Sequence, residues 1–248
     1  NDRDFGFVIS ESGAGYTWSV NSRENRLTPW SNDSVSDPVG EAIYIRDEET
    51  GEYWTPTPLP IREKETYIIR HGQGYTQFDH ASHGISSELQ VFVPLDASVK
   101  ISFLRLKNTT ENARRISVTS YVEWVLGVHR EDSAPHVVTA KDQETGMLLA
   151  RNSYNNEFNG RVAFSFMNQK PDSYTCDRKA FFGRNGSPTR PAGLGRECLS
   201  RLSGAALDPC AALQKKMDLD PGEECEIVVL LGQAKDIEEA RAILLRYG

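Results

Sequence analysis

The chain of 248 residues lacks the features that would place it in a membrane or on nucleic acid. It has no apolar run approaching the roughly 18 residues of a membrane-spanning helix, so we expect no direct membrane contact. Its formal net charge is −7, and its Lys and Arg residues are scattered. Nucleic acid needs clustered positive charge to neutralise its phosphates, which excludes it as a partner.

The start of the chain lacks two further features. There is no Met at the first position, and no basic stretch followed by an apolar run marks a signal peptide. Residues 1–4 lead directly into the strand-like residues 5–9. We therefore expect a piece of a longer protein of the cytoplasm.

Cysteine is scarce and chemical motifs are missing. The four cysteines all lie in the last third of the chain without a paired CxxC spacing, so we expect reduced thiols rather than a disulfide framework. The pair His80 and His83 has the spacing of two metal ligands but no identifiable third ligand, and we predict no metal site. There is no nucleophile elbow, phosphate-binding loop or dinucleotide fingerprint, so we predict no catalytic residue and no cofactor.

Alternating patterns predict an all-β, mainly antiparallel fold. Residues 42–46 and 53–54 flank a polar turn in which Gly51 stands where positive φ is needed, which predicts a hairpin. In residues 85–93, Ile85, Leu89, Val91 and Val93 share one face. Residues 99–107 also alternate, and residues 115–126 form the next long strand, a meander typical of a β-sandwich.

The last third of the chain changes character. Residues 168–209 are polar and glycine-rich, and we expect a long excursion with short strands at most, of the kind that is functional or contacts a neighbour. Residues 226–232 read as a last buried strand. A helix follows, with Asp236 as its cap and Glu239 at the reciprocal capping position. We predict a sandwich domain over residues 1–233 and the start of a helical linker over residues 234–248.

The most distinctive segment runs from Gly15 to Trp30. Aromatic rings cover the C–H face of a sugar, while amide, guanidinium and carboxylate groups bond its hydroxyls. The alternative is that both Trp residues fill the core of the sandwich. The candidate sugar-binding residues of this segment are Trp18, Asn21, Arg23, Glu24, Arg26 and Trp30.

Two other places hold candidate groups. Glu123 stands on a strand between aromatic residues, and we expect it to pair with an arginine such as Arg114 or Arg115 or to face a partner domain; a catalytic role is the alternative. His71 lies between Arg70 and a glycine pair, close to Tyr75. A hydrogen-bonded structural role and a sugar contact are both open for this histidine.

Several long motifs in a fixed order resemble glycoside hydrolase family 94, formerly glycosyltransferase family 36. The resemblance covers essentially the whole chain and matches the corresponding region of the cyclic β-1,2-glucan synthases; cellobiose phosphorylases are other members. The motifs are GYTWSVNSRENRLTPWSND, EAIYIRDEETGEYWTPTPLP, RHGQGYTQFDH, VFVPLDASVKI, YVEWVLG and LDPCAALQ.

The resemblance implies a galactose mutarotase-like β-supersandwich followed by a helical linker and an (α/α)6 barrel that carries the catalytic acid and the phosphate site. This chain would be the non-catalytic sandwich, inactive alone, within a phosphorylase or glucan synthase. The implied partners are a β-glucan oligosaccharide, the barrel of the same protein and a second copy in a homodimer. A parent synthase would be anchored in the bacterial inner membrane through other regions.

The resemblance of the matched motifs implies a sugar-binding or barrel-facing role for the segment from Trp18 to Trp30. It implies the same role for Arg70, His71 and Tyr75. Two alternatives remain open. The first is a stand-alone mutarotase-like epimerase, in which His71 or His136 would act as acid with Glu123 as base. The second is an assembly domain without sugar contact.

Overall fold

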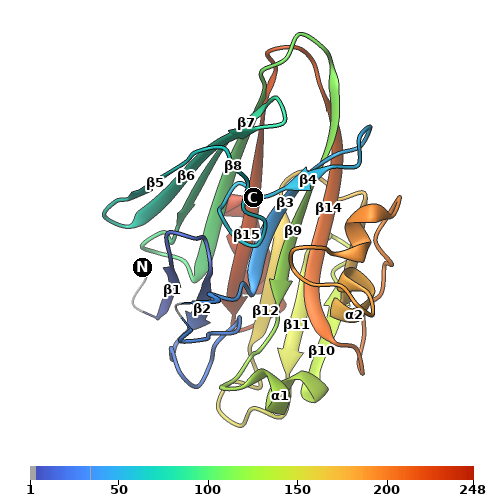
Figure 1. Cartoon of the computed structure of the whole chain (residues 1–248). Coiled ribbons are helices and arrows are strands. Elements are labelled where there is room, and N and C mark those ends of the chain that lie inside the picture. The colour runs from blue at the N-terminus through green and yellow to red at the C-terminus, as the bar shows by residue number, and fades with distance from the viewer. Residues whose placement is uncertain (1–3, 34) are drawn as a thin grey trace.

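The computed structural model describes residues 4–33 and 35–248. Most strands belong to one large antiparallel sheet (Figure 1). Its strands are β5 (Tyr67–His71), β6 (Tyr75–Ser82), β7 (Ile85–Phe92), β8 (Val99–Asn108), β10 (Val137–Lys141), β11 (Leu148–Asn152), β12 (Val162–Met167) and β15 (Glu224–Ala234). They lie in the order β10-β11-β12-β15-β8-β7-β6-β5.

A five-stranded antiparallel sheet faces the large one. Its strands are β3 (Glu41–Asp47), β4 (Tyr53–Trp54), β9 (Arg114–Glu123), β13 (Ser173–Asp177) and β14 (Pro209–Leu219), in the order β13-β14-β9-β3-β4. A separate antiparallel ribbon consists of β1 (Phe5–Ile9) and β2 (Gly15–Ser19) and lies at one end of the sandwich (Figure 1). The prediction of a mainly antiparallel sandwich is confirmed.

The core lies between the two large sheets. Ile85, Leu89, Val91 and Val93 share its inner surface, as their alternation predicted, each with no more than 6% exposure. Alternation works here because successive side chains of a strand point to opposite faces. The predicted hairpin after β3 is also present, with Gly51 at φ 78°.

Helices are few and short: α1 (Arg130–Ser133), α2 (Arg178–Phe182), α3 (Ile237–Tyr247) and the 3-10 turns η1 (Ala134–His136) and η2 (Ala192–Gly195). None of the helices in the described part of the chain is long and apolar enough to cross a membrane. The excursion over residues 168–209 was expected to hold short strands at most, but it also contains α2. The helix forms because Asp177 caps it by accepting a hydrogen bond from the amide of Lys179.

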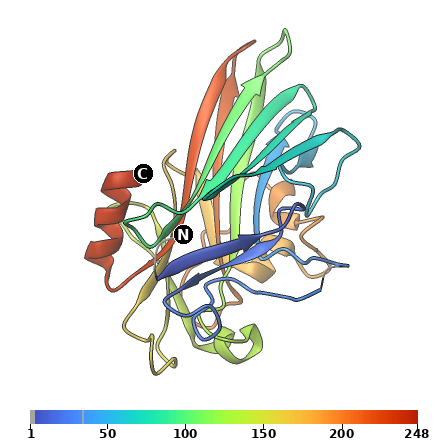
Figure 2. The same cartoon turned by 90° about the vertical axis from the view of Figure 1, so that its left-hand side faces the viewer.

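The helix α3 begins as predicted. Asp236 accepts from the amide of Glu239 at 2.8 Å, and Glu239 accepts from the amide of Lys235 at 2.7 Å. The helix lies against the outer face of the large sheet (Figure 2), where Ala240 and Leu244 are buried in a second apolar cluster. The helix is therefore packed on the sandwich rather than free of it.

Candidate functional site

The aromatic run forms a cluster on the β1–β2 ribbon and the loop that follows it. The ring of Tyr16 has its centroid 5.2 Å from that of Trp18 and 4.9 Å from that of Trp30. The guanidinium carbon of Arg26 lies 5.7 Å from the centroid of Tyr16. Trp30 is 37% exposed, and Trp18 is half-buried. We call Tyr16, Trp18, Arg26 and Trp30 the aromatic cluster.

The alternative in which the Trp residues of this run fill the core is wrong. Trp54 and Trp124 occupy that place, each with 0% exposure. Trp18 instead covers Gly6 of β1, where an added Cβ would come within 2.6 Å of the indole. Trp30 presents open ring surface, which an aromatic residue of the core would not.

The polar candidates of the run form an exposed turn beside the aromatic cluster. The Asn21 side chain accepts from the amides of Arg23 and Glu24 at 2.9 and 3.0 Å, and this pattern fixes the turn. Arg23 and Glu24 form an exposed ion pair of 3.4 Å. Asn21 thus has a structural use for its oxygen, while the two charged side chains stand in solvent.

The loop that carries the aromatic cluster is joined to the segment after β9. Arg26 and Gly127 exchange two main-chain hydrogen bonds of 3.2 Å, and the Arg26 side chain donates to the carbonyl of Val128 at 3.4 Å. The amide of Val125 donates to Leu27 at 2.9 Å. The structure therefore brings together two motifs that lie a hundred residues apart in sequence.

A buried polar contact fixes the ribbon to both sheets. Lys100 of β8 binds the carboxylate of Glu41 of β3 and donates to the hydroxyl of Thr17 of β2 at 2.9 Å. The hydroxyls of Thr17 and Thr28 each donate to Glu41 at 2.7 Å. Burial lowers the pKa of Lys100 to about 7, and the Glu41 carboxylate supplies the compensating charge. This contact thus helps to hold the strand that carries Tyr16 and Trp18.

A groove adjoins Trp30. One wall is the loop that contains Pro29 and Trp30, and another comes from the excursion over residues 168–209. The Glu123 and Arg178 side chains also line it. The sequence did not indicate that Arg178 and Pro188 would line this groove. The only signal for them was the length and polarity of the excursion itself.

Glu123 pairs with two arginines, but not with those expected. Its carboxylate oxygens lie 2.6 Å from Nε of Arg130 and 3.0 Å from Nε of Arg178, and it accepts from the Tyr121 hydroxyl at 3.2 Å. Asp208 contacts the same two guanidinium groups. The expected partners are engaged elsewhere, because Arg114 binds Asp47 and Arg115 binds Asp218. With both oxygens held by cations, Glu123 is poorly suited to act as a general base.

The second candidate set lies on the β5–β6 hairpin. His71 shares a 3.0 Å hydrogen bond with Thr76, Tyr75 lies over Gly72, and Arg70 binds Asp79. In the described part of the chain, these contacts stay within the hairpin and involve neither the aromatic cluster nor Glu123. His136 stacks on Tyr154, with 4.1 Å between ring centroids. The acid–base pair that an epimerase would need is therefore not assembled.

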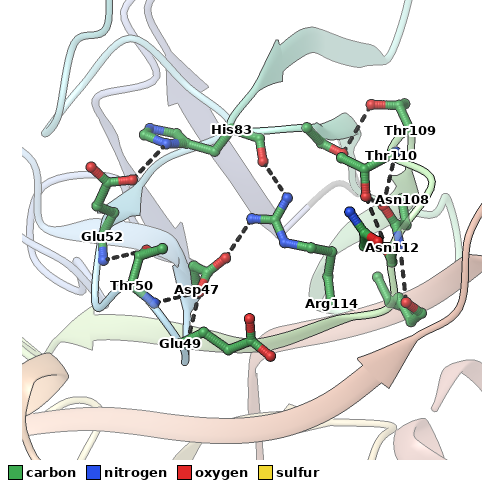
Figure 3. A network of polar contacts seen from close by, with 12 residues as sticks. Asp47, Glu49, Thr50, Glu52, His83, Asn108, Thr109, Thr110, Asn112 and Arg114 are labelled. Atoms are coloured by element: carbon green, nitrogen blue, oxygen red, sulfur yellow. Dashed lines mark hydrogen bonds and ion pairs between the residues drawn. The ribbon is translucent and has the colours of Figure 1, made fainter.

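A polar network at another end of the sandwich contains the two histidines with metal-ligand spacing. His80 and His83 contact the two oxygens of Glu63 at 3.0 and 2.7 Å. His83 also contacts Glu52 at 3.2 Å, and its carbonyl accepts from Arg114 (Figure 3). Although burial opposes it, hydrogen bonds from Ser82, His80 and His83 hold the pKa of Glu63 below its usual value. In residues 4–33 and 35–248 no group of three or more suitable side chains is placed to hold a metal ion.

Two unequal antiparallel sheets with a ribbon at one end define a β-supersandwich, and an exposed aromatic cluster beside a groove suits a carbohydrate-active protein. The chain belongs to glycosyl hydrolase family 94, because the model of that family's supersandwich domain matches residues 1–248.

Relatives of known activity agree with this family. The chain is 34% identical to the cyclic beta-(1,2)-glucan synthase NdvB of Rhizobium meliloti, over 98% of this chain and 9% of that protein. It is 29% identical to the N,N'-diacetylchitobiose phosphorylase of Vibrio proteolyticus, over 92% of this chain and 29% of that protein. The chain thus spans less than a third of the length of either relative.

A solved structure supports the fold alone. The galactose mutarotase related enzyme of Lactobacillus acidophilus aligns with a TM-score of 0.52 and 9% identity, over 94% of this chain and 96% of that chain. The mutarotase-like architecture predicted from the sequence is confirmed.

Proposed function

We propose that this chain is the non-catalytic, carbohydrate-contacting sandwich of a longer cytoplasmic glucan synthase or phosphorylase. It shapes the sugar site and packs on a catalytic barrel of the same protein. The observation that carries the proposal is the aromatic cluster, in which Trp30 lines a groove together with Arg178, while Arg26 lies over the ring of Tyr16. Rings and fixed donors of this kind match the two faces of a sugar.

The likeness to a cyclic glucan synthase supports a β-1,2-glucan as the ligand, and the likeness to phosphorylases supports a β-linked disaccharide unit as its minimum. The buried anchor of Lys100 and Glu41 supports a fixed rather than an adaptable surface. The arginine partners of Glu123 support a structural role for that carboxylate. A few sugar contacts in an open groove bind weakly, with a Kd on the order of millimolar.

Titration of the chain with linear and cyclic β-1,2-glucans, with cello-oligosaccharides for comparison, tests the proposal. We expect saturable changes in tryptophan fluorescence and in the NMR signals of Trp18 and Trp30. The variants Trp30→Ala and Arg26→Ala should weaken binding about fivefold or more. Tyr154→Ala is the matched control, because Tyr154 is an aromatic residue, 71% exposed, outside the aromatic cluster. No change at tens of millimolar glucan would overturn sugar contact by this chain.

A further inference from the structure

A second groove shares no residue with the groove at Trp30. It opens where the turn after β10 and the end of β12 face the start of β13, so both large sheets contribute to it. Its cations are Lys141, Lys170 and Arg201. We call it the basic groove.

The carboxylates of the basic groove are already engaged by other cations. Glu144 binds Arg241 at 2.8 Å. Asp172 contacts Lys215 at 3.5 Å and accepts from the amide of Lys216 at 2.7 Å. Neither of these two carboxylates is paired with the three cations of the groove, which outnumber them.

Those three cations lack a carboxylate partner in the described part of the chain. The Lys141 amine lies 4.9 Å from the ring centroid of Tyr174. The Arg201 guanidinium donates to the carbonyl of Asp172 at 3.2 Å, and Lys170 is exposed. In a chain whose net charge is −7, this is a local excess of positive charge inside a concave site.

An uncharged side chain of the basic groove, Asn168, also offers a donor. The Asn168 side-chain oxygen accepts from the amides of Gln169 and Val228, each at 2.8 Å, which leaves its NH2 group for the groove. Apolar surface comes from the partly buried Phe166. The lining thus combines fixed positive charge, an amide donor and an apolar wall.

We propose that the basic groove binds an anionic sugar, a saccharide that carries a phosphate or a carboxylate group. A neutral sugar would leave the three cations without a counter-charge, and a bare anion would leave the amide and the apolar wall unused. An oxyanion attached to a hydroxyl-bearing ring satisfies both parts of the lining. Nothing in this proposal requires the aromatic cluster.

The test is an NMR titration of the chain with D-glucose 6-phosphate and D-glucuronate. The first ligand carries a phosphate and the second a carboxylate, so the comparison shows which anionic group the groove binds. We expect one or both to shift the signals of residues 141–146 and 166–174, and to bind at least about tenfold tighter than glucose or inorganic phosphate. Higher salt should weaken this binding. Equal binding of glucose, or of inorganic phosphate alone, would overturn the proposal.

Variants locate the site. Lys170→Ala and Arg201→Ala should each weaken the anionic sugar about fivefold, because partly exposed charge-assisted contacts are lost. Lys64→Ala, which removes an exposed lysine outside the groove, is the matched control. Trp30→Ala should leave this binding intact while it weakens glucan binding, so the two proposals fail separately. Unchanged binding in both groove variants, with folding verified by circular dichroism, would contradict the proposal.

Discussion

Asp142, in the turn after β10, lies 2.8 Å from the guanidinium of Arg241 on α3. Hydrogen bonds from Arg241, and then from Thr145, lower the pKa of Asp142 to about 2 despite its burial. The same arginine also binds Glu144 and Glu238. The contact between Asp142 and Arg241 therefore fastens the last helix to the edge of the large sheet.

We expect Asp142→Asn to lower the thermal midpoint by a few degrees and to speed amide exchange in α3. Because the folded-state pKa lies below the usual 3.8, the stabilisation is complete above pH 3.8 and is lost as pH falls through about 2. Urea unfolding between pH 2 and pH 7 measures this. The gap between wild type and variant should be constant above about pH 4.5 and should shrink below it; a gap that grows in acid would contradict the assignment.

Trp54 and Trp124 should differ from Trp30 in their effect on stability. Trp54→Ala and Trp124→Ala each empty a fully buried site and should cost about 3–5 kcal/mol of unfolding free energy. Trp30→Ala should change stability little, because its ring already meets solvent. Denaturant unfolding followed by circular dichroism tests this, and a large loss in Trp30→Ala would show that the aromatic cluster is part of the core.

Loss of the Glu123 charge should lower the free energy of unfolding and should not remove a catalytic activity. Glu123→Gln leaves Arg130 and Arg178 with only Asp208 as counter-charge, and we expect a loss of about 2–3 kcal/mol. Arg115→Gln, which breaks an exposed ion pair on the same strand, is the control and should have little effect. Anomer interconversion above the buffer rate that disappears in Glu123→Gln would revive the epimerase alternative.

The contact of Lys100 with Glu41 and Thr17 should stabilise the position of the β1–β2 ribbon. Lys100→Met leaves the partly buried Glu41 carboxylate with only hydroxyl donors, so we expect a loss of about 2 kcal/mol and faster amide exchange in residues 15–19. The further change Glu41→Gln in the same protein should recover part of the loss. Lys107→Met, on the exposed face of the same strand, is the control and should leave the ribbon unchanged.

Local features of the fold could be predicted because they depend on neighbours in sequence. Three such features depend on short-range rules, and the structure contains each of them. They are the alternation of residues 85–93, the glycine of the turn at Gly51 and the cap at Asp236. The short helix α2 was missed because only five residues carry it, too few for a periodic signal.

Partners that depend on distant strands could not be predicted. Arg130 and Arg178 reach Glu123 only because β14 pairs with β9 and brings the excursion beside it. Which tryptophans fill the core could not be predicted for the same reason. The sequence around a Trp does not show whether its strand or loop faces the core until the sheets are placed. The kind of sugar that Trp30 and Arg26 contact depends on surface chemistry that strand patterns do not encode.

The position of β15 has a consequence for how this chain is made. In the large sheet it stands between β12 and β8, and it pairs with β8 from about 120 residues further along the chain. The hairpins β5 to β8 close through short turns and form from local contacts, whereas β15 must search for partners across the whole domain. During synthesis the two halves of the sheet therefore stay unjoined, each with a bare edge, until β15 leaves the ribosome. A stalled or truncated chain would expose both edges to other chains, which makes aggregation of nascent chains the characteristic hazard of this topology.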